Sequence, residues 1–169
     1  MEQTAKNIKK RAEPKDVFYT PTELVRIHLE LVKPLVREGD VIFDPFYGQG
    51  AYYNLFPEYF KNTYEFTEIQ LDKDFFTFDK KIDMIVSNPP YSMIDEVLKK
   101  SVELNPHTIS YLIGFHNLTT KRIEYMNTHG YKLVNLHLTK VFKWFGMSVI
   151  VVFSKQGENC VSFDRIVHR

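Results

Sequence analysis

The residues whose types and spacing best suit chemistry are Asn88-Pro89-Pro90-Tyr91, which follow an apolar run over residues 82–87. The run has the length of a buried strand. Two successive prolines permit neither helix nor further sheet pairing, so Asn88 is held at a strand end on a stiff backbone. Asn offers a carbonyl acceptor beside a donor, and each proline keeps its carbonyl while it lacks an N–H. Acceptors that converge beside a phenol ring suit a planar amino group attached to an aromatic ring. The alternative is that the tetrapeptide only marks a turn after a buried strand.

A second group of acids and glycines follows two earlier strands. A short buried strand is predicted to end at Asp44, and Gly48 and Gly50 form a Gly-x-Gly turn just after it. Such a turn lets the backbone approach a ligand at the carboxyl edge of a parallel sheet. Residues 63–67 are predicted to form the next strand, which delivers Glu68 18 residues after Gly50. A dinucleotide-binding fold places the acid that holds ribose hydroxyls at about this distance.

Helices and strands alternate along the rest of the chain and must position these groups. Thr20 as N-cap, Pro21 at the first helical position and Glu23 form a predicted capping box for the first helix. Helices are predicted over 21–33, 51–60, 92–104 and 119–129, and strands over 40–44, 63–67, 71–76, 82–87, 107–114, 131–138 and 148–154. This alternation, finished by an antiparallel pair, predicts an α/β fold with a mostly parallel sheet and helices on both faces.

Composition limits the classes of protein to which the chain can belong. Its 169 residues, 44% of them hydrophobic, are enough for one sizeable core. The 22 basic and 21 acidic residues nearly cancel, so any basic surface must be local. The single cysteine, Cys160, excludes a disulfide framework. No apolar stretch reaches the roughly 18 residues of a membrane span and there is no signal-peptide pattern, so we expect an intracellular protein.

Two further features bear on partners and metals. Residues 1–17 are polar and rich in lysine, and we expect a basic arm that either contacts phosphates or is simply solvated. The histidines show no ligand spacing, so we expect no metal site. They are His28, His107, His116, His129, His137 and His168.

The two motifs together resemble those of a known family. Asp44-Pro45-Phe46-Tyr47-Gly48-Gln49-Gly50 resembles the cofactor motif, and Asn88-Pro89-Pro90-Tyr91 the catalytic motif, of S-adenosylmethionine-dependent amino-group methyltransferases, especially the DNA adenine-N6 enzymes. Phe18-Tyr19-Thr20-Pro21 is similar to the segment that several of those enzymes place before the cofactor motif. The resemblance covers about 18–154. It implies a Rossmann-like fold whose mostly parallel sheet has seven strands and an antiparallel C-terminal strand, in one catalytic domain over 18–169.

The resemblance also assigns roles to individual residues. Asn88, Pro89, Pro90 and Tyr91 would be catalytic. The residues that would bind the cofactor, S-adenosylmethionine, are Tyr19, Thr20, Pro21, Asp44, Phe46, Gly48, Gly50, Glu68, Ile69, Asp74 and Phe75. Asp72 and Asp79 compete with Asp74 for its role. The target pocket would contain Tyr91, Ser92, Lys140, Phe142, Lys143 and Trp144, although Phe142 and Trp144 have ordinary core packing as an alternative.

The implied reaction is methyl transfer to adenine N6 in DNA by direct in-line displacement, with the target base flipped into the pocket. DNA enzymes of this type usually carry a target-recognition domain, whereas here the predicted core takes up nearly every residue from 18 onward. Target selection would then come from loops, the basic arm, a second copy of the chain or a partner subunit. The alternatives are an RNA base amine or a protein glutamine amide as acceptor, or a cofactor-binding subunit of a heteromeric enzyme. Compact enzymes of this sort resemble those encoded by phages and other viruses.

Overall fold

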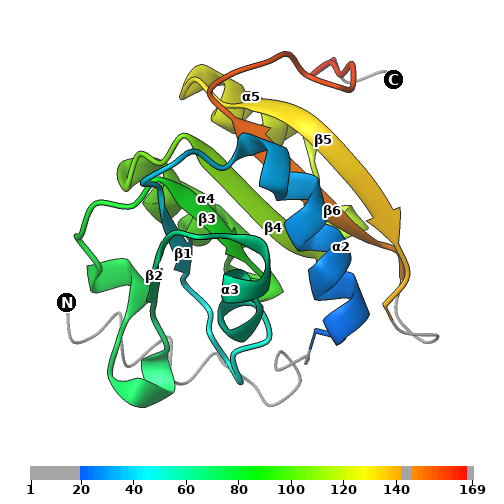
Figure 1. The fold of residues 1–169 in the computed structure, drawn as a ribbon. Coiled ribbons are helices and arrows are strands. Elements are labelled where there is room, and N and C mark those ends of the chain that lie inside the picture. The colour runs from blue at the N-terminus through cyan, green and yellow to red at the C-terminus, as the bar shows by residue number, and fades with distance from the viewer. Residues whose placement is uncertain (1–19, 142–145, 167–169) are drawn as a thin grey trace.

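The computed structural model describes residues 20–141 and 146–166, which form one six-stranded sheet of order β2-β1-β3-β4-β6-β5 (Figure 1). The strands are β1 (Val41–Asp44), β2 (Thr63–Phe66), β3 (Met84–Ser87), β4 (Thr108–Gly114), β5 (Lys132–Thr139) and β6 (Ser148–Ser154). The first four in chain order pair in parallel, and β6 lies antiparallel between β4 and β5. The predicted mostly parallel α/β sheet with an antiparallel C-terminal strand is confirmed. None of the helices in the two described segments is long and apolar enough to cross a membrane.

Helices cover both faces of this sheet, as predicted. They are α2 (Thr22–Val32) and α3 (Phe56–Tyr59) on one face, and α4 (Ile94–Glu103) and α5 (Thr120–Thr128) on the other (Figure 1). Because side chains alternate across a strand, Ile42 and Met84 pack under the first pair of helices, while Phe43 and Ile85 pack under the second. The helix predicted over 51–60 is shorter than expected, since only a 3₁₀ turn and the single turn of α3 form there.

The prediction of a seventh strand over 71–76 is wrong. Ile69–Leu71 and Phe75–Thr77 instead form 3₁₀ turns. Each turn follows an acid, Glu68 or Asp74, whose carboxylate accepts a hydrogen bond from the backbone N–H two residues later. Side chains that bond their own backbone in this way compete with the hydrogen bonds of a sheet ladder. The described residues therefore contain six strands, with β2 at one edge of the sheet.

The predicted capping box at the first helix is also wrong. The helix α2 begins at Thr22 with Pro21 as its N-cap, and no side chain caps it. The hydroxyl of Thr20 accepts a hydrogen bond from the side chain of Asn88 instead, at 3.1 Å. A contact with a residue 68 positions away has thus replaced the local one.

Candidate active site

The carboxyl ends of two neighbouring parallel strands bring the two predicted motifs together. The strand β1 ends at Asp44, β3 ends at Ser87, and Phe43 lies opposite Ile85 in the register that joins them. The hydroxyl of Ser87 donates a hydrogen bond of 2.5 Å to Oδ1 of Asp44. Ser87 was not among the predicted site residues, although its position just before Asn88 at a buried strand end was a usable signal.

Asp44 is fully buried, and its carboxylate is only half satisfied. Oδ1 accepts hydrogen bonds from Ser87 and from the N–H of Phe46 at 3.3 Å. Oδ2 has no hydrogen-bond partner among the described residues. Burial raises the pKa of Asp44 to about 7, although the Ser87 hydroxyl and the amides of Phe46 and Tyr53 act against the shift. An oxygen left in this state suits a cation or an N–H group.

Asn88 shows the same half-satisfied pattern. Its Nδ2 donates to Thr20 Oγ1 at 3.1 Å, so the amide is tied to the residue that precedes Pro21. Its Oδ1 is buried and has no hydrogen-bond partner within the described part of the chain. Pro89, directly after it, is buried as well. The end of β3 is therefore followed by a buried acceptor oxygen that has no donor among the described residues.

Tyr91 begins a 3₁₀ turn, Tyr91–Met93, that leads into α4. Burial raises the pKa of the Tyr91 phenol to about 12, against a lowering effect of Ser148 on β6. The phenol therefore stays neutral at physiological pH. Ser92, which was predicted to contact the target, is exposed next to it.

The glycine turn after β1 is tied to the end of β2. The N–H of Gly48 donates to Glu68 Oε2 at 2.7 Å, so the predicted ribose acid also orders the turn. Gly48 has φ +54, and a Cβ there would meet no atom closer than Phe46 O at 4.0 Å. Gly50 has φ +81 and is crowded, since a Cβ would clash with the Asn54 side chain. Both turn positions therefore favour glycine, and Gly48 also leaves open space beside the carboxyl edge.

The other predicted residues have more varied positions. Phe75 is 3% exposed, with its ring centroid 5.1 Å from that of Phe46, so it belongs to the core as well as to this edge. Ile69 is half-buried beside Glu68, and Lys140 is exposed just past β5. Tyr19, Phe142, Lys143 and Trp144, like the arm over 1–17, lie outside the described residues. Within the described ranges, no three His, Cys, Asp or Glu side chains gather as a metal ion would require.

Comparison with known proteins identifies the fold. No protein-family model and no curated protein matches the sequence. Solved structures do match. A modification subunit attributed to a type I restriction enzyme from Vibrio vulnificus is 13% identical with TM-score 0.61, over 94% of this chain and 48% of that one. TYW2 from M. jannaschii, solved in complex with AdoMet, is 18% identical with TM-score 0.55, over 82% and 77%. The chain has the Rossmann-like methyltransferase fold.

A third match belongs to a complex that acts on a protein. The Mtq2–Trm112 complex of E. cuniculi, responsible for the methylation of the translation termination factor eRF1, is 16% identical with TM-score 0.57, over 83% of this chain and 99% of that one. At these identities the likeness concerns the fold, and the activity must be argued from the site.

Proposed function

We propose that this chain transfers a methyl group from S-adenosylmethionine to an exocyclic amino group, that of adenine N6 in DNA. The observation that carries the proposal is Asn88 Oδ1, a buried acceptor without a partner among the described residues, on an amide that is hydrogen-bonded to Thr20. A buried acceptor of this kind is costly unless a ligand satisfies it. The two amine hydrogens of a base are donors of the right number and geometry for Asn88 Oδ1 and the Pro89 carbonyl.

The residues around the glycine turn fit the cofactor. When bound, S-adenosylmethionine supplies an electrophilic methyl group on a sulfonium centre. The orphaned Oδ2 of Asp44 suits the cationic methionine end, and the open space at Gly48 admits it. Glu68 accepts one backbone N–H at each oxygen, and a carboxylate has lone pairs left for the ribose hydroxyls. Ile69 would pack on the adenine of the cofactor, and Tyr19, Thr20 and Pro21 would close over it.

The remaining groups act on the acceptor amine. Its nitrogen lone pair is delocalised into the ring, which makes it a poor nucleophile. Two acceptors, Asn88 Oδ1 and the Pro89 carbonyl, would bind the amine hydrogens. The nitrogen could then pyramidalise and direct its lone pair toward the methyl group of the cofactor. The neutral ring of Tyr91 would stack on the target base, which must leave a duplex to enter the site. No general base is needed, because the amine can lose its proton after transfer.

Two observations bear on the class of acceptor. The match to the modification subunit attributed to a type I restriction enzyme covers 94% of this chain, and Asp44-Pro45-Phe46 resembles the cofactor loop of DNA enzymes. The second candidate is a protein glutamine amide, which the match to the Mtq2–Trm112 complex favours. That complex also motivates a partner subunit as the supplier of target recognition. An RNA base amine would use the same acceptors.

The test is transfer of labelled methyl from S-adenosylmethionine to unmethylated DNA, followed by digestion to nucleosides and mass analysis. We expect N6-methyldeoxyadenosine with the wild-type chain and far less of it with Asn88→Ala. Absence of label in DNA, when calorimetry confirms cofactor binding, would overturn DNA as acceptor. The same assay with RNA and with a glutamine-containing protein extract would then identify the acceptor class.

A further inference from the structure

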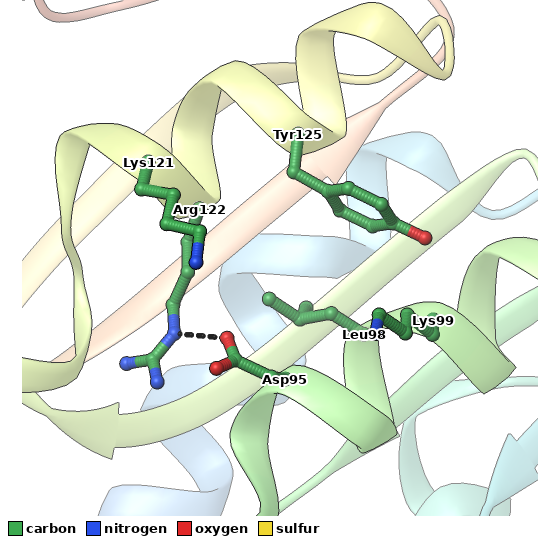
Figure 2. A pocket seen from close by; sticks show the side chains of 6 residues that line it. All are labelled: Asp95, Leu98, Lys99, Lys121, Arg122 and Tyr125. Carbon is green, nitrogen blue, oxygen red and sulfur yellow. Dashed lines mark hydrogen bonds and ion pairs between the residues drawn. The ribbon is translucent and has the colours of Figure 1, made fainter. Parts of the chain in front are cut away.

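A hollow between α4 and α5 lies outside the residues assigned to the reaction. Its volume is about 170 Å³. Three of its lining residues come from α4 and three from α5 (Figure 2). They are Asp95, Leu98, Lys99, Lys121, Arg122 and Tyr125. Pockets for whole small molecules measure about 300–1,000 Å³, so this hollow suits one group of a larger ligand.

The charge of the hollow is positive. Arg122 Nε donates to Asp95 Oδ1 at 2.8 Å, so the charges of these two residues are matched. The hydrogen bond from Arg122 lowers the pKa of Asp95, and the charges of Lys121 and Lys99 lower it further, which places both lysines near the pair. Lys99 and Lys121 are exposed, and neither forms an ion pair with any described residue. Two cations therefore remain without an opposite charge.

The rest of the lining is apolar and aromatic. Leu98, 6% exposed, forms the floor, and the half-buried ring of Tyr125 lies above it (Figure 2). The ring centroid of Tyr125 is 4.3 Å from that of His129, so the ring is held in place by packing. An aromatic face beside free lysines is the combination with which proteins hold a nucleotide: the cations meet the phosphate and the ring meets the base or sugar.

The hollow lies close to the acceptor site along the chain. Asp95 and Lys99 follow Tyr91 by four and eight residues of continuous 3₁₀ and α-helix. At the rise of these helices the separation is roughly 7 to 14 Å. A DNA strand advances about 3.4 Å per nucleotide, so this is about two to four nucleotides. On the other side, Arg122 Nη1 donates to Asn117 O at 2.8 Å, just past the carboxyl end of β4.

We propose that this hollow binds the sugar–phosphate backbone of the DNA a few nucleotides from the target base. A phosphate lies between Lys99 and Lys121, and the adjoining base or sugar lies against Tyr125. The inference rests on the proposed function in so far as a DNA acceptor is required. Contacts of this kind provide affinity and register without reading sequence.

Binding of a labelled, unmethylated DNA oligonucleotide, measured by fluorescence anisotropy at several salt concentrations, tests the inference. The double variant Lys99→Ala/Lys121→Ala should bind about tenfold more weakly at low salt. Its plot of log affinity against log salt should be shallower by about 1, the change expected when one phosphate is no longer neutralised. The matched control is Lys61→Ala. Lys61 is exposed, precedes the edge strand β2 and does not line the hollow. The Lys61→Ala variant should bind the oligonucleotide as the wild type does.

A second pair of variants tests the aromatic wall. Tyr125→Leu should bind the oligonucleotide several-fold more weakly, whereas Tyr125→Phe, which keeps the ring, should bind as the wild type does. Wild-type affinity and salt slope in the lysine double variant would overturn the inference, and so would a wild-type chain that binds no oligonucleotide. Methyl transfer is measured separately: absence of transfer to DNA with lysine-dependent binding intact would count against the proposed function alone. Cofactor affinity by calorimetry should not change in any of these variants.

Discussion

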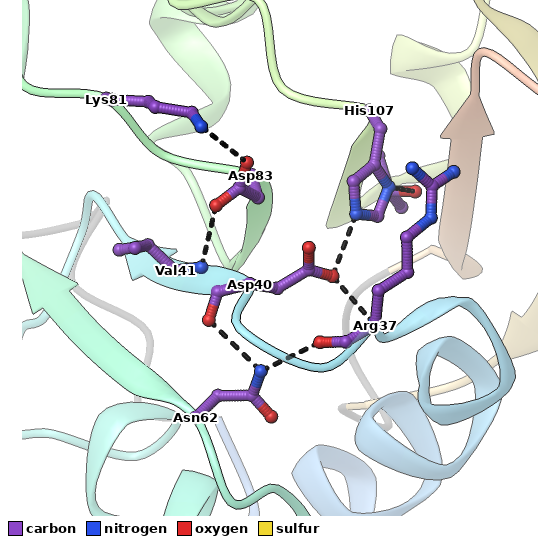
Figure 3. Close-up of polar contacts among 8 residues, drawn as sticks. Arg37, Asp40, Val41, Asn62, Lys81, Asp83 and His107 are labelled. Carbon is purple, nitrogen blue, oxygen red and sulfur yellow. Dashed lines mark hydrogen bonds and ion pairs between the residues drawn. The ribbon is translucent and has the colours of Figure 1, made fainter.

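Polar side chains lie at both ends of β1 and β3. Their hydrogen bonding differs between the two ends. At the amino end, Asp40 Oδ2 accepts from Arg37 N at 2.8 Å and pairs with His107 Nε2 at 2.9 Å. Asp83 Oδ2 accepts from Val41 N at 2.9 Å (Figure 3). Asn62 Nδ2 donates to the Asp40 carbonyl at 3.1 Å and to that of Arg37. Both acids at this end have partners that fix the strand ends.

At the carboxyl ends of β1 and β3, two oxygens lack partners within the described residues, one on Asp44 and one on Asn88. A buried acceptor left unpaired costs about 1–3 kcal/mol, so a chain keeps one only where something else depends on it. The same side-chain chemistry therefore stabilises the fold at one end of the sheet and is available to ligands at the other. Substitutions at matched positions should separate the two roles.

The largest effect should follow Asn88→Ala. It removes an acceptor that is fully used only near the transition state, so kcat should fall by about 10²–10³ while cofactor affinity stays nearly unchanged. The matched change at the other end, Asn62→Ala, should lower stability by about 1–3 kcal/mol because it removes the donor to two carbonyls of the segment before β1. The kcat of Asn62→Ala, corrected for the fraction of folded protein, should equal that of the wild type. Steady-state kinetics and urea unfolding measure both, and equal activity in Asn88→Ala would refute the proposed mechanism.

Asp44→Asn should produce the next largest effect, and its sign depends on pH. The pKa of Asp44 is about 7 in the folded chain against 3.8 for the ordinary side chain, so between these values the unfolded chain binds fewer protons. Stability therefore falls as pH rises from 3.8 to 7, by on the order of a few kcal/mol. Asn cannot ionise, so the stability of the variant relative to wild type should rise over this interval and then level.

The relative measurement cancels the contributions of other buried titratable groups, such as His28, because both proteins contain them. Burial lowers the pKa of His28 to about 3, so its contribution is lost as pH falls below 6.5, opposite in sign to that of Asp44. At pH 8 the same variant should bind S-adenosylmethionine at least about tenfold more weakly by calorimetry, the scale of losing a charged hydrogen bond. Asp40→Asn, at the amino end, should leave cofactor affinity unchanged. Equal weakening in both variants would mean that Asp44 acts only on the fold.

Glu68→Ala should weaken cofactor binding by about 1–3 kcal/mol, since it removes hydrogen bonds to a charged acceptor and frees the N–H of Gly48. The control is Glu65→Ala on the adjoining strand, whose carboxylate pairs with Lys80 at 3.2 Å. That surface pair contributes about 0–1 kcal/mol to stability and should not affect the cofactor. Unchanged affinity in Glu68→Ala would show that a different acid holds the ribose.

The sequence predicted the features of this site that depend on strand ends, and missed those that depend on distant contacts. Apolar runs bounded by turn residues located Asp44 and Asn88 at the ends of β1 and β3, because strand length and proline chemistry are local properties. The pairing of Asp40 with His107, 67 positions apart, leaves no local signal. The 3₁₀ turns at Ile69–Leu71 and Phe75–Thr77 were mistaken for a strand because their apolar residues outweighed the capping acids.

The contact between Thr20 and Asn88 is the clearest long-range case, and it gives the smallest of the four effects. Thr20 suited a local helix cap, yet its hydroxyl accepts from Asn88 Nδ2. Thr20→Val keeps the shape of the side chain and removes this acceptor. The amide of Asn88 can then rotate, so its oxygen is no longer held toward the acceptor amine. The loss of one hydrogen bond, about 1 kcal/mol, should lower kcat roughly fivefold. Thr20→Ser should restore kcat, because it keeps the hydroxyl. If Thr20 acts only by closing over the cofactor, KM for S-adenosylmethionine should rise instead while kcat stays, and the amide of Asn88 would then be held by its backbone alone.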